Sequence, residues 1–206
     1  MARLNVNPTR MELKKLKARL ATAVRGHKLL KDKVDEMIRR FSALIRSVKT
    51  EREALTDELI ACLGSFSLAS AQLSPEALAL AFSMPSGHIE ASFGIDNLLS
   101  IEVPTVQIKG VRQTGLPYAY SEVTSEADHA ATAMTGVVQK LLALSAKEKT
   151  VALLSYEIER NKRRVNALEH IVIPQLQETI RYIKSKLDEN ERAATIRLLK
   201  FKNTSL

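Results

Sequence analysis

Apolar residues recur at alternating spacings of three and four along the N-terminal part of the chain, the pattern of a coiled-coil heptad. A capping box at positions 9–12, directly after Pro8, marks where this helix begins. We predict one helix over residues 9–63, with a seam that blurs where Glu51 and Glu58 occupy core positions. The seam residues are Leu13, Leu16, Leu20, Ala23, His27, Leu30, Val34, Met37, Phe41, Leu44 and Val48.

A second apolar row predicts a C-terminal helix over residues 121–202. Its mean spacing is about 3.67 residues, the period of an eleven-residue repeat, which predicts little supercoiling. Pro174 lies inside this helix and lacks a backbone N–H, so we expect a local kink near Val172. The seam residues are Leu154, Ile158, Asn161, Val165, Leu168, Val172, Leu176, Ile180, Ile183 and Leu187.

Helix-breaking residues gather between the two helices, where positions 64–117 hold most of the glycines and prolines. A serine cap followed by a proline predicts a short helix over residues 74–83. Beyond it, apolar residues alternate with polar ones and predict strands at 97–103 and 105–111, an edge hairpin with Pro104 between its strands.

Terminal helices that flank one compact insert should pair antiparallel. We therefore predict a mainly α fold, in which a long antiparallel two-helix coiled coil of the N- and C-terminal helices carries a small α/β insert with a β-hairpin. The expected parts are an N-terminal shaft helix over 1–63, an insert over 64–120 and a C-terminal shaft helix over 121–206. At about 1.5 Å per residue, such helices form a shaft and not a compact ball.

The composition supports long helices and adds a charge asymmetry. Aromatic residues are only 4% of the chain and Trp is absent, which is typical of coiled coils. The net charge is +8, and it is concentrated in residues 1–40. This basic stretch implies an acidic partner surface, a nucleic acid or a solvated helix face. No apolar run approaches the roughly 18 residues of a membrane span, so we expect no direct span.

Residues that carry chemistry are sparse. His27, His88, His129 and His170 lie far apart, and a single cysteine, Cys62, excludes both an internal disulfide and a cysteine-rich metal site. The sequence has no glycine-rich phosphate loop and no nucleophile elbow. We expect no catalytic residue, no metal and no cofactor. On these grounds a coiled-coil scaffold and a basic helical nucleic-acid-binding protein both stay open.

Two segments narrow these alternatives. The first, in residues 3–33, contains RLNVNPTRMEL and RGHKLLKDK, and the second, in residues 157–192, contains EIER, RRVNALE, IPQL and KLDENER. Together they resemble the D subunit of the V/A-type rotary ATPases, the central rotor shaft. The resemblance covers both terminal helices, whereas the insert is similar only in its plan of a variable segment with a hairpin.

The resemblance implies a non-catalytic rotor subunit of the central stalk of a V/A-type ATPase or ATP synthase. Its paired terminal helices would enter the hexamer of catalytic A and B subunits, where ATP binds and is hydrolysed. The insert end would hold the F subunit and face the membrane-rotor adaptor subunit. The chain would transmit torque to or from a rotor driven by protons or sodium ions. It would be cytoplasmic, peripheral on the inner face of the membrane, and would bind no nucleic acid.

Cations that lie off the seams of the matching helices are the candidate contacts with the hexamer on this interpretation. The resemblance does not fix them individually, and hydrated ion pairs of this kind are individually weak. The candidates are Arg3, Arg10, Lys14, Lys17, Arg25, Lys28, Lys31, Arg160, Lys162, Arg163, Arg164, Arg192, Arg197 and Lys200.

Overall fold

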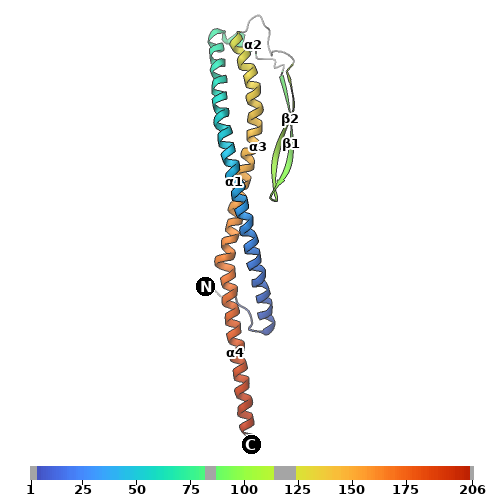
Figure 1. Cartoon of the computed structure of the whole chain (residues 1–206), viewed down its shortest axis with the longest axis vertical. Coiled ribbons are helices and arrows are strands. Elements are labelled where there is room, and N and C mark those ends of the chain that lie inside the picture. The colour runs from blue at the N-terminus through green and yellow to red at the C-terminus, as the bar shows by residue number, and fades with distance from the viewer. Residues whose placement is uncertain (1–3, 82–86, 114–123, 205–206) are drawn as a thin grey trace. The chain divides into compact units, whose positions relative to one another are not determined.

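The computed structural model describes residues 4–81, 87–113 and 124–204. Helices dominate these residues, and one β-hairpin interrupts them (Figure 1). In chain order the elements are α1 (Arg10–Gln72), α2 (Pro75–Ala81), β1 (Gly87–Leu98), β2 (Ile101–Gln113), α3 (Ser125–Ala167), the π-helix η1 (Leu168–Val172) and α4 (Ile173–Thr204).

The chain divides into two compact units. Unit 1 combines Met1–Glu36 with Ile158–Leu206, and unit 2 is Met37–Glu157. Each unit therefore contains a part of α1. Unit 1 also contains the end of α3, η1 and α4, and unit 2 contains most of α3. The fold class is confirmed: the chain is mainly α, with a two-stranded antiparallel hairpin between its long helices.

Helix α1 begins as predicted but ends later. The Oγ1 atom of Thr9 accepts a hydrogen bond from the N–H of Glu12 at 3.2 Å, which caps the first turn. The predicted end at residue 63 is wrong, because α1 continues through Gly64 to Gln72. A glycine costs a helix only about 1 kcal/mol. Burial of Cys62 and Ala69, which are 3% and 0% exposed, offsets that cost.

The π-helix η1 lies where a kink was predicted. Pro174 has no N–H, and its ring would clash with the carbonyl of residue 170 in a regular α-helix. In η1 the N–H of Ile173 instead donates to the carbonyl oxygen of Leu168, five residues earlier. The wider turn takes up one additional residue.

The hairpin exists as predicted, but its turn lies elsewhere. Strands β1 and β2 pair antiparallel, and the turn consists of Leu99 and Ser100, with φ of 55° and 69°. Two consecutive positive φ values define a type I′ turn, whose twist matches that of the strands. Pro104 lies inside β2, paired with Ile95, so the predicted strand bounds were wrong.

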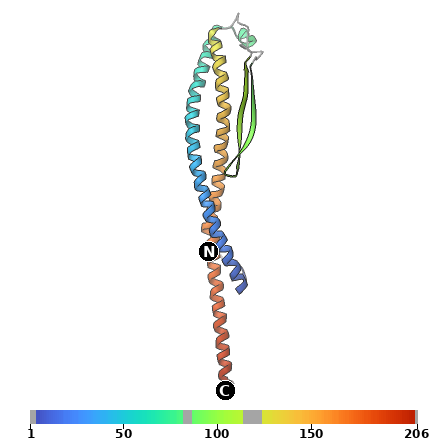
Figure 2. The same ribbon diagram turned by 45° about the vertical axis from the view of Figure 1, so that its right-hand side comes forward.

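In unit 2, α1 and α3 lie side by side (Figure 2). Val48 and Leu55 of α1 form one core cluster with Val137 and Leu144 of α3. Each pair of positions is seven residues apart, as a heptad requires.

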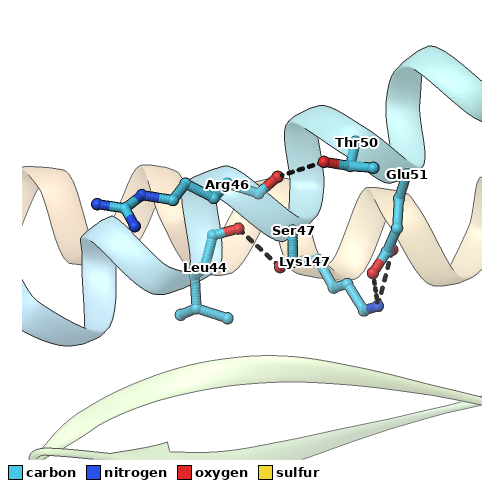
Figure 3. A network of polar contacts seen from close by, with 6 residues as sticks. All are labelled: Leu44, Arg46, Ser47, Thr50, Glu51 and Lys147. Atoms are coloured by element: carbon cyan, nitrogen blue, oxygen red, sulfur yellow. Dashed lines mark hydrogen bonds and ion pairs between the residues drawn. The ribbon is translucent and has the colours of Figure 1, made fainter.

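Ion pairs flank this core. Glu51 Oε1 lies 2.6 Å from Lys147 Nζ, and Glu58 Oε1 lies 2.6 Å from Lys140 Nζ (Figure 3 shows the Glu51 pair). These two glutamates are therefore not core residues, although the sequence spacing assigned them to core positions. The later glutamate on α1, Glu58, pairs with the earlier lysine on α3, Lys140. The two helices are therefore antiparallel.

Unit 1 has its own core. Leu16 of α1 packs with Leu176 and Ile183 of α4, and all three are buried. The Oγ1 atom of Thr179 accepts a hydrogen bond from the N–H of Leu4 at 3.2 Å and donates to the carbonyl oxygen of Gln175 at 2.7 Å. Partly buried apolar residues extend this cluster: Leu4, Val6, Leu13, Leu20, Ala23, Val172, Ile180 and Leu187.

Candidate functional site

Charge distinguishes the two units more clearly than any cavity does. Unit 1 contains 21 Lys and Arg against 10 Asp and Glu, a net charge of +11. Unit 2 contains 10 Lys and Arg against 13 Asp and Glu, a net charge of −3. A field of one sign over one unit attracts an acidic partner surface.

All the candidate contact cations belong to unit 1. Arg3 lies outside the described residues, and every other candidate is exposed. Those on α1 are Arg10, Lys14, Lys17, Arg25, Lys28 and Lys31, those on α3 are Arg160, Lys162, Arg163 and Arg164, and those on α4 are Arg192, Arg197 and Lys200.

Several of these cations already have intramolecular partners. Arg10 pairs with Glu191 of α4, and Arg163 pairs with Glu159 one helical turn earlier. Both pairs are exposed, so each contributes only about 0–1 kcal/mol and is easily exchanged for an external carboxylate.

The structure places most predicted seam residues inside the units. Met37, Leu154 and Ile183 are fully buried, and Leu16, Val34, Val165 and Leu176 are at most 8% exposed. Val48 and Asn161 are also buried. The remaining seam residues are half-buried: Leu13, Leu20, Ala23, His27, Leu30, Phe41, Leu44, Ile158, Leu168, Val172, Ile180 and Leu187. Sequence reasoning missed Thr179, which is 0% exposed. Its position, three residues after Leu176 and four before Ile183, was the available signal.

His27 contacts the π-helix. Its Nε2 atom lies 3.3 Å from Oε2 of Glu169, and its side chain is 19% exposed. The sequence placed His27 on the seam, and it lies half-buried at the edge of the helix pair. Another polar pair, Lys186 and Glu189, lies on α4. Its hydrogen bond raises the pKa of the lysine and lowers the pKa of the glutamate.

Among the described residues no group of three or more His, Cys, Asp or Glu side chains is arranged to hold a metal ion. A groove in unit 2 is lined by Ala61, Ala133 and Gly136 together with His129 and Glu126. Cys62 also lines this groove, and its thiol donates a hydrogen bond to the carbonyl oxygen of Ala130 at 3.3 Å, so its hydrogen-bond partner is not a base.

Among the described residues, α1 is long and apolar enough to cross a membrane, although the sequence predicted no direct span. Within α1 an 18-residue window reaches a mean hydropathy of 1.2, and 17% of the window is buried. Residues 59–72 of α1 contain no Asp, Glu, Lys or Arg, yet they include the buried Cys62 and Ala69 of the helix pair. Core helices meet the same criteria of length and hydropathy, so this finding is weak evidence for a span.

The two helix pairs, the cationic surface of unit 1 and the sparse chemistry define a class: helical proteins that act through contact with other macromolecules. The sequence profile of the ATP synthase D subunit matches residues 12–203. The chain belongs to this family.

Close relatives agree over nearly the full length. The chain is 46% identical to the V-type ATP synthase D subunit of Clostridium botulinum (strain Alaska E43 / Type E3), over 98% of this chain and 97% of that protein. It is 47% identical to the V-type ATP synthase D subunit of Enterococcus faecalis (strain ATCC 700802 / V583), over 98% of both chains.

Family membership gives the chain a place in an assembly. It is a non-catalytic subunit of the central stalk of a V-type ATP synthase, a membrane-associated complex. The alternatives of a coiled-coil scaffold and of a nucleic-acid-binding protein have no support in these comparisons.

Proposed function

We propose that this chain transmits torque between the catalytic A/B hexamer and the ion-driven membrane rotor. Unit 1 is the part that contacts the A and B subunits. The F subunit and the membrane-rotor adaptor subunit bind at the insert, residues 64–120. The chain works on the cytoplasmic side, peripheral to the inner face of the membrane.

The concentration of cations on unit 1 carries this proposal. With a net charge of +11, unit 1 attracts acidic loops from several directions. Because each hydrated contact is worth only about 0–1 kcal/mol, no single ion pair holds the chain at one angle. A surface of this kind gives attraction without locking, which rotation requires.

Torque in this proposal is a set of differential affinities. Each conformation of the hexamer binds one orientation of the chain better than the others, so ATP turnover shifts the preferred angle stepwise. Rotation imposed by the membrane rotor shifts the conformations of the hexamer in the reverse direction, and this drives synthesis.

The test begins with assembly. The purified chain is mixed with the A, B and F subunits, and co-elution and ATP hydrolysis are measured with and without it. We expect one copy per hexamer and an altered turnover rate. Elution of the chain alone as a self-paired helical dimer would contradict the proposal.

A matched pair of variants then tests the cationic surface. Lys28→Glu reverses an exposed charge on unit 1, and Lys149→Glu reverses an exposed charge on unit 2. We expect Lys28→Glu to weaken binding to the A/B hexamer by about fivefold at low salt, and Lys149→Glu to change it less than twofold. If both variants weaken binding to the hexamer equally, unit 1 is not the part of the chain that contacts the A and B subunits.

A further inference from the structure

The hairpin turn determines which backbone groups of the two strands point outward. In a two-residue type I′ hairpin the pair that closes the turn, Leu98 and Ile101, is hydrogen-bonded. Bonded and non-bonded pairs then alternate along an antiparallel ladder. Ile95 and Pro104 therefore form a non-bonded pair, and so do Phe93 and Val106. The backbone polar groups of these four residues point away from the opposite strand.

The two outer edges of the hairpin differ in their capacity to pair. On β2, Pro104 has no N–H at an outward position, so this edge lacks a donor in its middle. β1 contains no proline, and Ala91, Phe93 and Ile95 present outward donors and acceptors in register. The outer edge of β1 is thus the edge that accepts a third strand.

Burial shows the same asymmetry. Five consecutive residues of β1, positions 93–97, are exposed, whereas none of the residues 103–106 of β2 is exposed. Val103 of β2 is only 6% exposed, so its side chain is buried. β1 is therefore open to solvent at positions 93–97.

An apolar face accompanies the open edge. Phe93 and Ile95 are 75% and 76% exposed, and they lie on one face with their partners Val106 and Pro104. Phe93 and Ile95 are neighbours on this face because alternate residues of a strand point the same way. They favour a third strand that has an apolar residue at every second position.

Charge identifies the kind of strand that fits. Residues 89–108 contain three acidic side chains, Glu90, Asp96 and Glu102, and no Lys, Arg or His. The part of the hairpin nearer the turn is therefore acidic in a chain of net charge +8, whereas Lys109 and Arg112 lie at the far end of β2. A second copy of the same hairpin would bring like charges together, which opposes self-pairing. A basic strand matches the site.

We propose that the outer edge of β1 binds an extended segment of another protein subunit as a third antiparallel or parallel strand, with apolar residues alternating with Lys or Arg. The proposal rests on the proposed function only for the source of this segment, which is another subunit of the same complex. Main-chain hydrogen bonds to Ala91, Phe93 and Ile95 hold the segment, and Glu102 attracts its cations.

Amide hydrogen exchange of the intact chain, free and in the complex assembled with the A, B, F and adaptor subunits, tests this pairing. In the free chain the outward amides of Phe93 and Ile95 exchange rapidly, while the inward amides of Gly94 and Asp96 are protected. On assembly we expect at least tenfold slower exchange at Phe93 and Ile95. Unchanged exchange overturns the proposal. If the chain nevertheless co-elutes with the complex, the proposed function stands.

Two proline variants compare the edges directly. Phe93→Pro removes an outward N–H from β1, and Val106→Pro removes the paired outward N–H from β2, just as Pro104 already does at its own position. We expect Phe93→Pro to lower the affinity for the assembled partner subunits at least tenfold, and Val106→Pro to change it less than twofold. Protected inward amides in each free variant establish that the hairpin is folded. Equal effects of both variants overturn the proposal.

Two further variants separate the contributions. Phe93→Ala keeps the N–H and removes the aromatic ring, so it should weaken binding less than Phe93→Pro. Glu102→Lys should weaken binding about threefold to tenfold at low salt, and Asp57→Lys on α1 is its control. Tighter binding of Glu102→Lys would show that the partner is not basic, which overturns the assignment of the segment.

Discussion

Units 1 and 2 solve the same packing problem with different sequence periods. In unit 2 the buried residues of α1 from Val48 onward are seven apart: Val48, Leu55, Cys62 and Ala69. In unit 1 the returning helix repeats its core positions every eleven residues, as Val165, Leu176 and Leu187 do. Both units nevertheless pair their helices antiparallel. In unit 1 Arg10 contacts Glu191 and the later His27 contacts the earlier Glu169.

The π-helix explains the difference. Asn161 and Ile183, both buried, are 22 positions apart, one more than three heptads. From Leu154 to Val172 the seam spacings alternate between four and three. The additional residue falls in η1, whose hydrogen bond spans five residues in place of four. The additional residue in η1 therefore accounts for the eleven-residue step from Val165 to Leu176, whereas the step from Leu176 to Leu187 lies within α4.

A buried charge in each unit gives the largest expected effect and tests whether the units open separately. Ile183→Asp places an unpaired carboxylate in the core of unit 1 and should cost about 3–5 kcal/mol of the free energy of unfolding. Val137→Asp does the same in unit 2. Amide exchange should then rise in the mutated unit alone, while Ile196→Asp, at a site 63% exposed, should change little. Loss of protection in both units would mean that they unfold together.

Two deletions test the inserted residue itself. Ile171 in η1 and Gln177 in α4 are both exposed, so neither deletion removes a core side chain. In a Pro174→Ala background, deletion of Ile171 should let the turn close to a regular α-helix within about 1 kcal/mol of that parent. Deletion of Gln177 rotates either Leu176 or the pair Thr179 and Ile183 out of the core. Its cost in urea unfolding should exceed about 3 kcal/mol. Similar costs would disprove the insertion.

Thr179 provides a smaller test of unit 1. Thr179→Val keeps the shape but leaves the N–H of Leu4 without its acceptor, which should cost about 1–2 kcal/mol. Thr195→Val is the control, because the hydroxyl of Thr195 bonds only to a carbonyl of its own exposed helix. Urea unfolding of the two variants should differ by at least about 1 kcal/mol. No difference would mean that the N-terminal segment contributes nothing to unit 1.

Periodicity and composition were sufficient for the fold class, because helical spacing and charge are local properties of the sequence. They misplaced details that depend on contacts between distant segments. Glu51 and Glu58 became ion-pair partners because α3 presents Lys147 and Lys140 at the matching interval. The hairpin turn moved because Leu99 and Ser100 adopt positive φ values, which their residue types do not favour.

The candidate site was less predictable than the fold. Exposure of the cations on unit 1 follows from their positions off the seams, but the partner that each one contacts belongs to another chain. The sequence alone did not show which backbone N–H groups of β1 point outward. It became visible only when the turn was placed, because a shift of one residue reverses which N–H groups of a strand point outward.

The ion pairs of unit 2 give the smallest expected effect and the sharpest contrast in salt dependence. Glu58→Gln removes the charge that contacts Lys140 at the edge of the core and should cost about 0.2–1 kcal/mol at low salt. At 1 M salt, where the screening length is about 3 Å, the cost should fall towards zero. Leu55→Ala, one turn earlier in the same unit, should cost about 2–5 kcal/mol at either salt concentration. Heptad packing therefore stabilises this helix pair more than charge does. If the stability cost of Leu55→Ala depended on salt, this conclusion would be wrong.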